Sequence, residues 1–290
     1  MPASDRPRHP RWLRRPPPEV PRLGEVRRTL RRLRLHTVCE GARCPNRAEC
    51  YGAGNATFMI LGERCTRDCA FCSVPHGPRS APESDEPARL AEAVADWGLD
   101  YVVITSVTRD DLPDGGAGAF AETVEALGGL TQPPLVELLI PDFAGDPAAL
   151  KRVIAARPAV LGHNVETVPR LYPGLRNGAD YSRSLDVLRR TVAAGLIAKS
   201  GLMCGLSETR DELRAVFDDL AAAGVRILTL GQYLQPTPRQ RPVERHLPPD
   251  EFDNLAGDAR QHGIPVVASG PLVRSSYRAR HYYELARSQE

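Results

Sequence analysis

Short apolar runs alternate with amphipathic helical patterns over most of the chain. The apolar runs have the length of buried strands and cover residues 57–61, 101–105, 135–140, 159–162, 196–202 and 226–230. Between them, apolar residues recur at the spacing of a helix with one buried face, as in Leu213, Val216, Phe217 and Leu220. Six strand–helix units in strict alternation predict an α/β fold in which a parallel sheet, covered by helices, closes into a partial (β/α)6 barrel of the TIM type.

Start and stop signals accompany the helical patterns. Asp146 and Pro147 predict an N-cap followed by the first residue of a helix. Thr209 and Glu212 have the spacing of a capping box, and Gly224 stands where the helix that they begin should end. These residues set the expected ends of two of the helices.

Polar segments follow several of the predicted strands. In barrels of this type, functional groups lie at the carboxyl ends of the strands. Three cysteines follow the first run, and polar residues follow the second, fourth and sixth runs at 105–111, 163–167 and 231–235. The sequence therefore predicts a pocket that these segments share.

Composition and charge narrow the class of protein. The 290 residues, 42% of them apolar, are enough to bury a core. The formal net charge of +2 gives no strong field toward nucleic acid or a membrane, and no run approaches the length of a membrane span. We therefore expect neither nucleic acid nor a membrane among the partners.

Six of the seven cysteines fall into two triplets. The first is a C-x4-C-x5-C pattern at Cys39, Cys44 and Cys50, and the second is a C-x3-C-x2-C pattern at residues 65–72. Clustered cysteines in a chain of this size indicate metal sites in a reducing compartment, here the cytoplasm. Three thiolates leave a fourth position open, for water on zinc or for a cofactor on a 4Fe–4S cluster. Taken alone, the first triplet fits structural zinc and iron–sulfur equally well.

The second triplet, Cys65, Cys69 and Cys72, has Phe71 before its last cysteine and resembles the cluster motif of radical S-adenosylmethionine enzymes. The resemblance implies that these cysteines hold a 4Fe–4S cluster and that S-adenosylmethionine chelates its fourth iron. Electron transfer to the sulfonium would then yield a 5′-deoxyadenosyl radical. The alternative, a zinc knuckle, usually offers paired C-x2-C motifs and four ligands.

Longer motifs narrow the resemblance to the lipoyl synthase family. They are T-S-V-x-R-D-D-L-P-D-G-G at 105–116, H-N-x-E-T-V at 163–168, K-S-G-L-M at 199–203, L-T-L-G-Q-Y-L-Q-P-T at 228–237 and R-S-S-Y-x-A at 274–279. The resemblance implies a sulfurtransferase that inserts two sulfur atoms, at C6 and C8 of an octanoyl chain attached to a lysine of a lipoyl-carrier domain. Acid–base chemistry cannot break these unactivated C–H bonds, which explains the need for a radical.

The same resemblance implies a second, auxiliary 4Fe–4S cluster that supplies the sulfur. Its ligands would be Cys39, Cys44 and Cys50, with Ser276 as the fourth. A hydroxyl is a poor match for iron beside thiolates, so we expect that bond to be labile. The chain then divides into an Arg- and Pro-rich arm, partly disordered (1–34), an auxiliary-cluster segment (35–55), the partial barrel (56–270) and a C-terminal tail with the R-S-S-Y motif (271–290).

Contacts to S-adenosylmethionine are assigned by the same resemblance. Phe71 is expected to shape the adenine pocket, and Asn164, Glu166, Arg183 and Lys199 are candidates for the ribose, amine or carboxylate. Lys199 should be buried at a strand end, where an ammonium needs a partner.

The sequence departs from the family pattern at three places. Thr108 stands where an aspartate is expected, Cys204 where an aliphatic residue is usual, and residues 173–180 differ from the usual run. Cys204 is predicted to be a small core residue.

The implied partners are octanoylated carrier domains of 2-oxoacid dehydrogenase complexes and of the glycine cleavage system. An electron donor such as ferredoxin or flavodoxin and an iron–sulfur carrier that rebuilds the cluster are expected as well. One alternative is a biotin-synthase-like enzyme, which gives no reason for the R-S-S-Y motif. The other is a zinc-binding nucleic-acid protein, for which 6% aromatic residues and a near-neutral barrel are a poor match.

Overall fold

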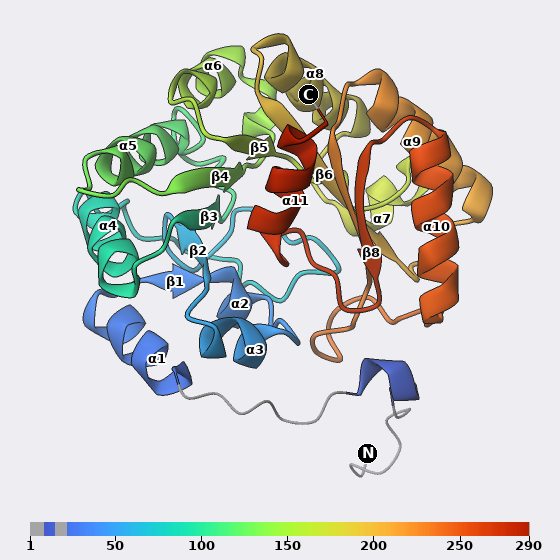
Figure 1. Cartoon of the computed structure of the whole chain (residues 1–290), viewed down its shortest axis with the longest axis horizontal. Coiled ribbons are helices and arrows are strands. Elements are labelled where there is room, and N and C mark those ends of the chain that lie inside the picture. The colour runs from blue at the N-terminus through green and yellow to red at the C-terminus, as the bar shows by residue number, and fades with distance from the viewer. Residues whose placement is uncertain (1–8, 15–21, 290) are drawn as a thin grey trace.

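The computed structural model describes residues 9–14 and 22–289, and at its centre is one eight-stranded sheet. The strands are β1 (His36–Thr37), β2 (Thr57–Ile60), β3 (Tyr101–Ser106), β4 (Leu135–Leu139), β5 (Val160–Gly162), β6 (Ile197–Cys204), β7 (Ile227–Gln232) and β8 (Val266–Gly270). Strand β1 runs antiparallel to β2, and each later strand runs parallel to the one before it. The spatial order follows the chain from β1 to β8, which makes the described sheet a curved, open barrel (Figure 1).

Six helices cover the outer face of this sheet (Figure 1): α4 (Glu86–Trp97), α5 (Ala117–Gly128), α6 (Pro147–Ala155), α8 (Tyr181–Ala193), α9 (Arg210–Ala222) and α10 (Pro249–Gln261). The other helices of the described chain are α1 (Leu23–Arg32), α2 (Val38–Gly41), α3 (Arg47–Gly52), α7 (Tyr172–Leu175) and α11 (Ala279–Arg287). Short 3-10 turns lie at η1 (Arg11–Leu13), η2 (Phe143–Gly145) and η3 (Pro169–Leu171).

The predicted strand–helix alternation is confirmed, and so are the predicted helix ends. Asp146 caps α6 by accepting a hydrogen bond from the backbone of Ala148, at 2.8 Å. Thr209 and Glu212 form a complete capping box at the start of α9. Gly224 follows that helix with φ of +78°, a conformation that favours glycine.

The prediction of six strands was short by one parallel strand, because it missed β8. This strand has three small or medium apolar residues, ends in Ser269 and Gly270 and lies between two prolines. Its two valines favour a strand, but an apolar run of three residues is too short to predict one from pattern. Pairing along the whole of β7, from Ile227↔Val266 to Gly231↔Gly270, supplies the stability that the local sequence lacks.

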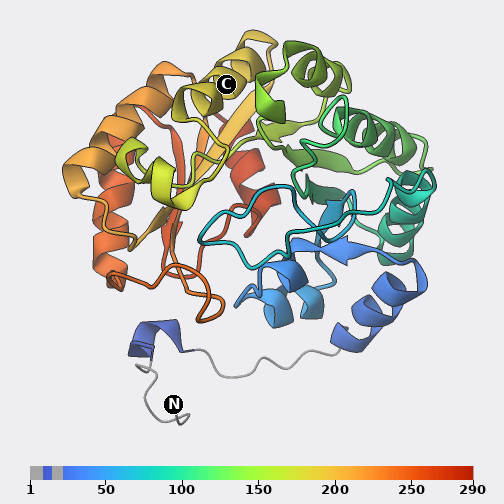
Figure 2. The same cartoon turned by 180° about the vertical axis from the view of Figure 1, so that it is seen from behind.

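Helix α11 closes the amino-terminal end of the barrel. Its residue Ala286 belongs to a buried cluster with residues of four parallel strands, among them Val160 and Val266. Tyr283 packs against the same cluster and against Tyr101. Figure 1 shows α11 in front of the strands, and Figure 2 shows the loop after β2 crossing the opposite face.

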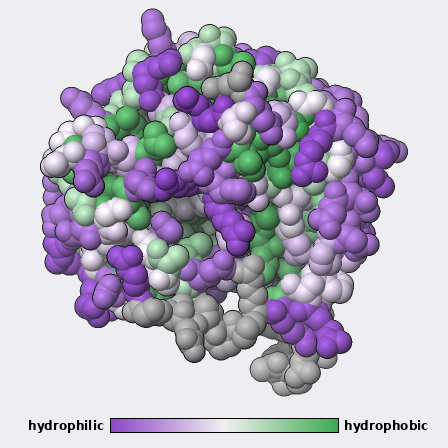
Figure 3. All heavy atoms as spheres, in the orientation of Figure 1, coloured by the Kyte–Doolittle hydropathy of each residue, from purple (hydrophilic) through white to green (hydrophobic). Residues whose placement is uncertain are grey.

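The surface on the α11 side is largely hydrophilic (Figure 3). Among the described residues, no helix has the length and apolar character needed to cross a membrane. The predicted arm of residues 1–34 lies partly outside the described residues. Its described parts are η1, where Trp12 donates to the carbonyl of Leu247 at 3.1 Å, and the stretch that includes α1.

Candidate functional site

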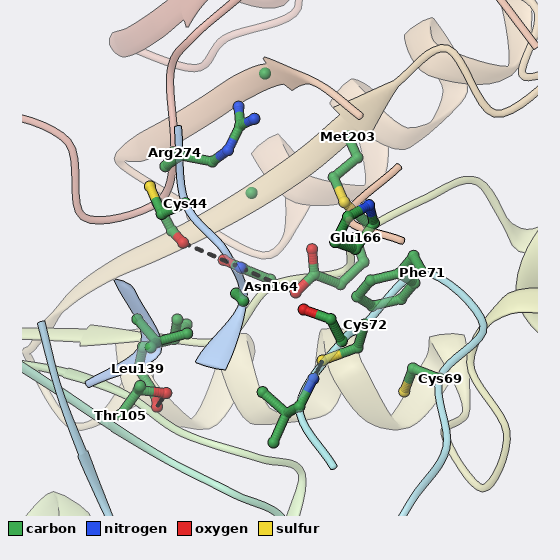
Figure 4. A pocket seen from close by; sticks show the side chains of 18 of the residues that line it. Cys44, Cys69, Phe71, Cys72, Thr105, Leu139, Asn164, Glu166, Met203 and Arg274 are labelled. Carbon is green, nitrogen blue, oxygen red and sulfur yellow. Dashed lines mark hydrogen bonds between the residues drawn. The ribbon is translucent and has the colours of Figure 1, made fainter. Parts of the chain in front are cut away.

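A cavity of about 510 Å³ lies at the carboxyl ends of the strands. Each of the polar segments predicted to follow a strand contributes to its wall, so the predicted shared pocket is confirmed. Nine of the predicted site residues line the cavity: Cys39, Cys44, Cys65, Cys69, Phe71, Cys72, Asn164, Glu166 and Ser276. The structure therefore brings cysteines of both triplets to one space (Figure 4).

Backbone amides surround the sulfurs of the second triplet. Cys65 Sγ accepts N–H groups from Arg67 at 3.4 Å and from Thr108 at 3.3 Å, and Cys72 Sγ accepts the N–H of Val74 at 3.4 Å. Hydrogen bonds to sulfur stabilise thiolates and are a feature of iron–sulfur sites. Residue 108 thus donates its backbone N–H to the Cys65 sulfur. A backbone donor does not depend on the side chain, so threonine can replace the aspartate expected from the family pattern.

Burial opposes thiolate formation in this triplet. It raises the pKa of Cys69 to about 11 and that of Cys72 to about 12, and the neighbouring thiols add to both effects. A bound cluster displaces the thiol protons and supplies positive charge. Three free, half-buried thiols, two of which accept backbone N–H groups, fit a metal cluster better than any role as neutral core groups.

Contacts from three other segments hold the cysteine loop in place. Arg67 lies between Asp110, at 2.8 Å, and Asp142, at 2.7 Å. Ala70 donates from its backbone to the carbonyl of Leu175, at 2.9 Å, within the segment 173–180 that departs from the family pattern. These contacts fix the loop after β2 against the loops after β3, β4 and β5.

Asp142 is the buried centre of the charge network at this edge. Burial raises the pKa of its carboxyl, but the hydrogen bond and charge of Arg67 outweigh burial and hold it below the ordinary value. Arg183, at 3.2 Å, approaches the same carboxylate from α8. Arg183 is not among the residues that line the cavity, whereas the other candidates Asn164 and Glu166 are.

Asn164 and Glu166 form a polar corner after β5. Asn164 Nδ2 donates to Glu166 Oε1 at 3.0 Å, and Glu166 has a positive φ of 64°. Burial raises the pKa of the Glu166 carboxyl. Asn164 Oδ1 is buried without a hydrogen-bond partner. An acceptor left open in a cavity wall fits a ligand with N–H or O–H groups, as S-adenosylmethionine has.

Gly201 on β6 makes room for this corner. A Cβ at this position would lie 2.6 Å from Thr229 Oγ1 and 2.8 Å from Asn164 Oδ1, and both distances are shorter than van der Waals contact. Any larger residue would therefore displace the asparagine whose carbonyl is open to a ligand.

Lys199 was predicted as a contact to S-adenosylmethionine, and the structure places it elsewhere. Its Nζ lies 2.6 Å from Glu137 Oε1, and Tyr101 Oη donates to the other oxygen of the same carboxylate at 2.6 Å. These side chains are buried inside the barrel, and Lys199 does not line the cavity. The partner that a buried ammonium needs is thus a carboxylate of the protein.

The first cysteine triplet lies on α2, α3 and the turn between them. Cys39 is buried, and burial raises the pKa of its thiol to about 11, while a hydrogen bond from the backbone of Thr57 lowers it. Thr57 Oγ1 also donates to Ser276 Oγ at 2.8 Å. Ser276 therefore shares a partner with a cysteine of this triplet. Cys50 is half-buried on α3 and is not among the residues that line the cavity.

The C-terminal segment is attached to the cysteine segment by long-range hydrogen bonds. Asn46 Nδ2 donates to the carbonyl of Leu272 at 2.7 Å, and Tyr277 Oη donates to Glu49 at 3.1 Å. These contacts join positions more than two hundred residues apart in the sequence and bring the R-S-S-Y motif to the triplet. Ser275 Oγ, by contrast, accepts from Asn164 at 3.4 Å, on the other side of the segment.

Four arginines of the cavity wall were missed by sequence reasoning: Arg43, Arg67, Arg176 and Arg274. Three of them lie inside motifs that were analysed only for their cysteines and serines, so the motifs themselves were the available signal. Arg176 had no such signal, because it lies in the segment that departs from the family pattern. Cys204, the seventh cysteine, is fully buried in the core, as predicted.

The amino-acid sequence is similar to sequences of known proteins. The radical SAM superfamily matches residues 59–220. The chain is 53% identical to the lipoyl synthase of Trichlorobacter lovleyi over 95% of its own length and 98% of that protein. It is 52% identical to the lipoyl synthase of Geobacter sulfurreducens, over 95% and 91% of the two chains.

Solved structures share the fold at low sequence identity. Streptococcus suis SuiB bound to S-adenosylmethionine superposes with a TM-score of 0.57 at 10% identity, over 75% of this chain and 50% of that one. Methylornithine synthase (PylB) superposes with a TM-score of 0.50 at 15% identity, over 85% and 81% of the two chains.

Proposed function

This chain belongs to the lipoyl synthase family of the radical S-adenosylmethionine superfamily, and on that basis we propose which of its residues perform each part of the reaction. The activity is insertion of two sulfur atoms into an octanoyl chain, with S-adenosylmethionine and two 4Fe–4S clusters as cofactors. Membership in this family excludes the two alternatives, a biotin-synthase-like enzyme and a zinc-binding nucleic-acid protein.

We assign Cys65, Cys69 and Cys72 as ligands of the cluster that cleaves S-adenosylmethionine. When bound, that cluster supplies the electron from which the hydrogen-abstracting radical arises. The chain's own part is to hold the cysteine loop rigid through Arg67 and to offer backbone N–H groups to sulfur. A cysteine loop that is held rigidly would keep the reactive radical close to the C–H bond that it attacks.

Asn164 and Glu166 are proposed to bind S-adenosylmethionine. Asn164 offers an unpartnered carbonyl oxygen, and Glu166 offers a buried carboxyl group beside it. Phe71, in the same wall, would pack on the adenine. Arg183 and Lys199 are left out of this assignment, because carboxylates of the protein already hold them.

Cys39, Cys44, Cys50 and Ser276 are proposed to hold the auxiliary cluster, whose sulfide is consumed as a substrate. The observation that supports this most directly is the Thr57–Ser276 hydrogen bond, since Thr57 is also a partner of Cys39. Ser275 faces Asn164 instead and is the less suitable ligand. The cavity that both triplets approach gives one space for the octanoyl chain between radical source and sulfur source.

The enzyme acts on octanoylated carrier domains. We propose the carriers of 2-oxoacid dehydrogenase complexes and of the glycine cleavage system as substrates, a ferredoxin or flavodoxin as electron donor and an iron–sulfur carrier for cluster repair. A cytoplasmic location is proposed from the seven free cysteines, which a reducing compartment preserves.

Product analysis tests the proposed function. The reconstituted enzyme is incubated anaerobically with S-adenosylmethionine, a reductant and an octanoyl-lysine peptide, and the peptide is analysed by mass spectrometry. We expect a product with two added sulfur atoms and one 5′-deoxyadenosine released for each C–H bond broken. Release of 5′-deoxyadenosine without sulfur in the peptide would refute the auxiliary-cluster assignment and leave the radical site standing.

A further inference from the structure

Four arginines line the cavity, and their surroundings differ: Arg43, Arg67, Arg176 and Arg274. Arg43 is exposed to solvent. Arg67 is matched by the two aspartates described above, at 2.8 and 2.7 Å. Solvent therefore compensates the charge of Arg43, and two carboxylates compensate the charge of Arg67.

Arg176 is supported by neutral and charged groups together. Its Nη1 donates to Tyr172 Oη at 2.8 Å and to the carbonyl of Asn164 at 3.1 Å. Its positive charge also acts on Cys69 and Glu166, whose pKa values it lowers against the effect of burial. The second cysteine triplet thus has a cation of its own.

Arg274 has far fewer partners. Its Nη1 donates to the carbonyl of the adjacent Val273 at 2.6 Å, the one hydrogen bond that its guanidinium makes among the described residues. Within that same part of the chain, no carboxylate forms an ion pair with Arg274. A guanidinium has five N–H donors in a planar fork, so most of them remain free. They belong to a half-buried side chain in the cavity wall.

Cys44 and Arg274 line the same cavity, where the negative charge of a Cys44 thiolate would act on the guanidinium. Figure 4 draws both side chains in the cavity wall. The backbone geometry around Arg274 leaves little freedom. A Cβ at Gly231 would lie 2.2 Å from the carbonyl oxygen of Val273 and 3.3 Å from Arg274 Nη1. Glycine at this position of β7 therefore allows the C-terminal segment to cross the strand closely and to hold its arginine over the cavity.

We propose that Arg274 is the counter-charge of the auxiliary site: its guanidinium stabilises the negative charge of the group held by Cys39, Cys44 and Cys50. The inference rests on the proposed function of that triplet. Three thiolates bring three negative charges to a partly buried site. A cation in the same cavity wall, with no carboxylate partner among the described residues, lowers their electrostatic cost. Arg274 is a positioning and charge-setting residue, since its role is exerted through the ligands.

A cation fixed beside a cluster favours the reduced form, which is more negative, and so raises the reduction potential. It also slows loss of iron, because it stabilises the thiolate ligands. Both quantities can be measured without turnover. They separate a role in charge from a role in packing, since a residue that only fills space would leave the potential unchanged.

The experiment uses full-length chain in which Cys65, Cys69 and Cys72 are replaced by alanine, so that the auxiliary site alone is loaded. Arg274→Gln and Arg274→Lys are made in this background. Arg278→Gln serves as the matched control, because Arg278 is exposed in the same segment and its guanidinium lies 5.4 Å from the Tyr277 ring centre. Iron content, the midpoint potential by electron paramagnetic resonance and iron release to a chelator are measured.

We expect Arg274→Gln to shift the midpoint potential to a more negative value and to release iron several-fold faster, while Arg274→Lys restores most of both properties and Arg278→Gln changes neither. Failure of the glutamine variant to load iron, with loading kept in the lysine variant, would also support a role of charge. An unchanged potential in Arg274→Gln would overturn the inference, as would equal loss of iron in folded Gln and Lys variants. If the parent background binds no cluster, the proposed function of the first triplet fails instead.

Discussion

Thr57 Oγ1 donates a hydrogen bond to Ser276 Oγ over 2.8 Å and so joins the first parallel strand of the barrel to the C-terminal segment. The same threonine contacts the thiol of Cys39. One side chain at the start of β2 therefore places a serine hydroxyl beside a cysteine, although 219 and 18 positions separate it from these residues in sequence. This relationship is the geometric basis for the proposed oxygen ligand.

Ser276→Ala is expected to bind near-normal iron and to transfer little or no sulfur. The serine oxygen has less affinity for iron than a thiolate, so its loss removes the labile bond and leaves three strong ones. Ser276→Cys is expected to hold iron more tightly and also to transfer poorly. Iron content and lipoyl-peptide yield are the measurements. Ser275→Ala is the control, with wild-type yield expected; a wild-type yield from Ser276→Ala would show that the assignment is wrong.

Replacing Cys65, Cys69 and Cys72 together by alanine is expected to halve the iron content, from about eight to about four atoms per chain. Cleavage of S-adenosylmethionine should be abolished, because no iron with an open position remains beside Asn164 and Glu166. Iron analysis and chromatography of 5′-deoxyadenosine check these results. Full retention of iron in this variant would contradict the ligand set.

The complementary variant replaces Cys39, Cys44 and Cys50. We expect it to keep reductive cleavage of S-adenosylmethionine and to lose sulfur insertion, because radical formation needs only the other triplet. Deoxyadenosine release and peptide mass are measured on the same sample. Loss of both activities in a folded protein that still binds four irons would argue against the division of labour.

Asp142→Asn is expected to destabilise the protein by about 3–5 kcal/mol at pH 7, since it leaves the buried charge of Arg67 partly uncompensated. The pKa of Asp142 lies below its ordinary value, so its stabilising effect is present above the pKa of the unfolded chain and is lost as pH falls through the folded one. The stability difference between parent and variant should therefore be constant from pH 7 to about pH 5 and shrink mainly below about pH 4. Urea denaturation from pH 7 to about pH 2 measures it.

The control for that series is Asp186→Asn. Asp186 pairs with Arg190 on the surface of α8, and both side chains are about half exposed, at 50% and 51%. We expect a loss of less than about 1 kcal/mol with little dependence on pH. A loss at Asp142 as small as that at Asp186 would show that the buried network does not hold the cysteine loop.

Lys199→Met is expected to lower the free energy of unfolding by about 3–5 kcal/mol, because it leaves the buried Glu137 carboxylate without its cation. The double variant Lys199→Met/Glu137→Leu should recover most of that loss, since an apolar pair can replace a buried ion pair. In folded protein, the KM for S-adenosylmethionine should stay within about twofold of wild type, because Lys199 does not line the cavity. A tenfold rise in KM for S-adenosylmethionine would show that Lys199 does contribute to cofactor binding.

Much of the fold could be predicted because its signals are local. The six strands from β2 to β7 differ from their predicted runs by at most two residues at either end, and helix α9 begins at the predicted capping box. Apolar period and cap chemistry act within a few residues, so one sequence displays them. The motif resemblance likewise predicted a set of cluster ligands, and nine of the predicted site residues line one cavity.

Other features depended on partners far away in the sequence. Strand β8 exists through its pairing with β7, Lys199 is paired with Glu137 across 62 positions, and Arg274 lies in the cavity wall because Gly231 lets the C-terminal segment pass. A buried charge displays its need for a partner in the sequence but not the identity of that partner. The sequence by itself therefore determined the order of strands and helices, the cysteine triplets and the family. Only the tertiary structure decided which charges meet, because those choices depend on distances between segments that local sequence does not encode.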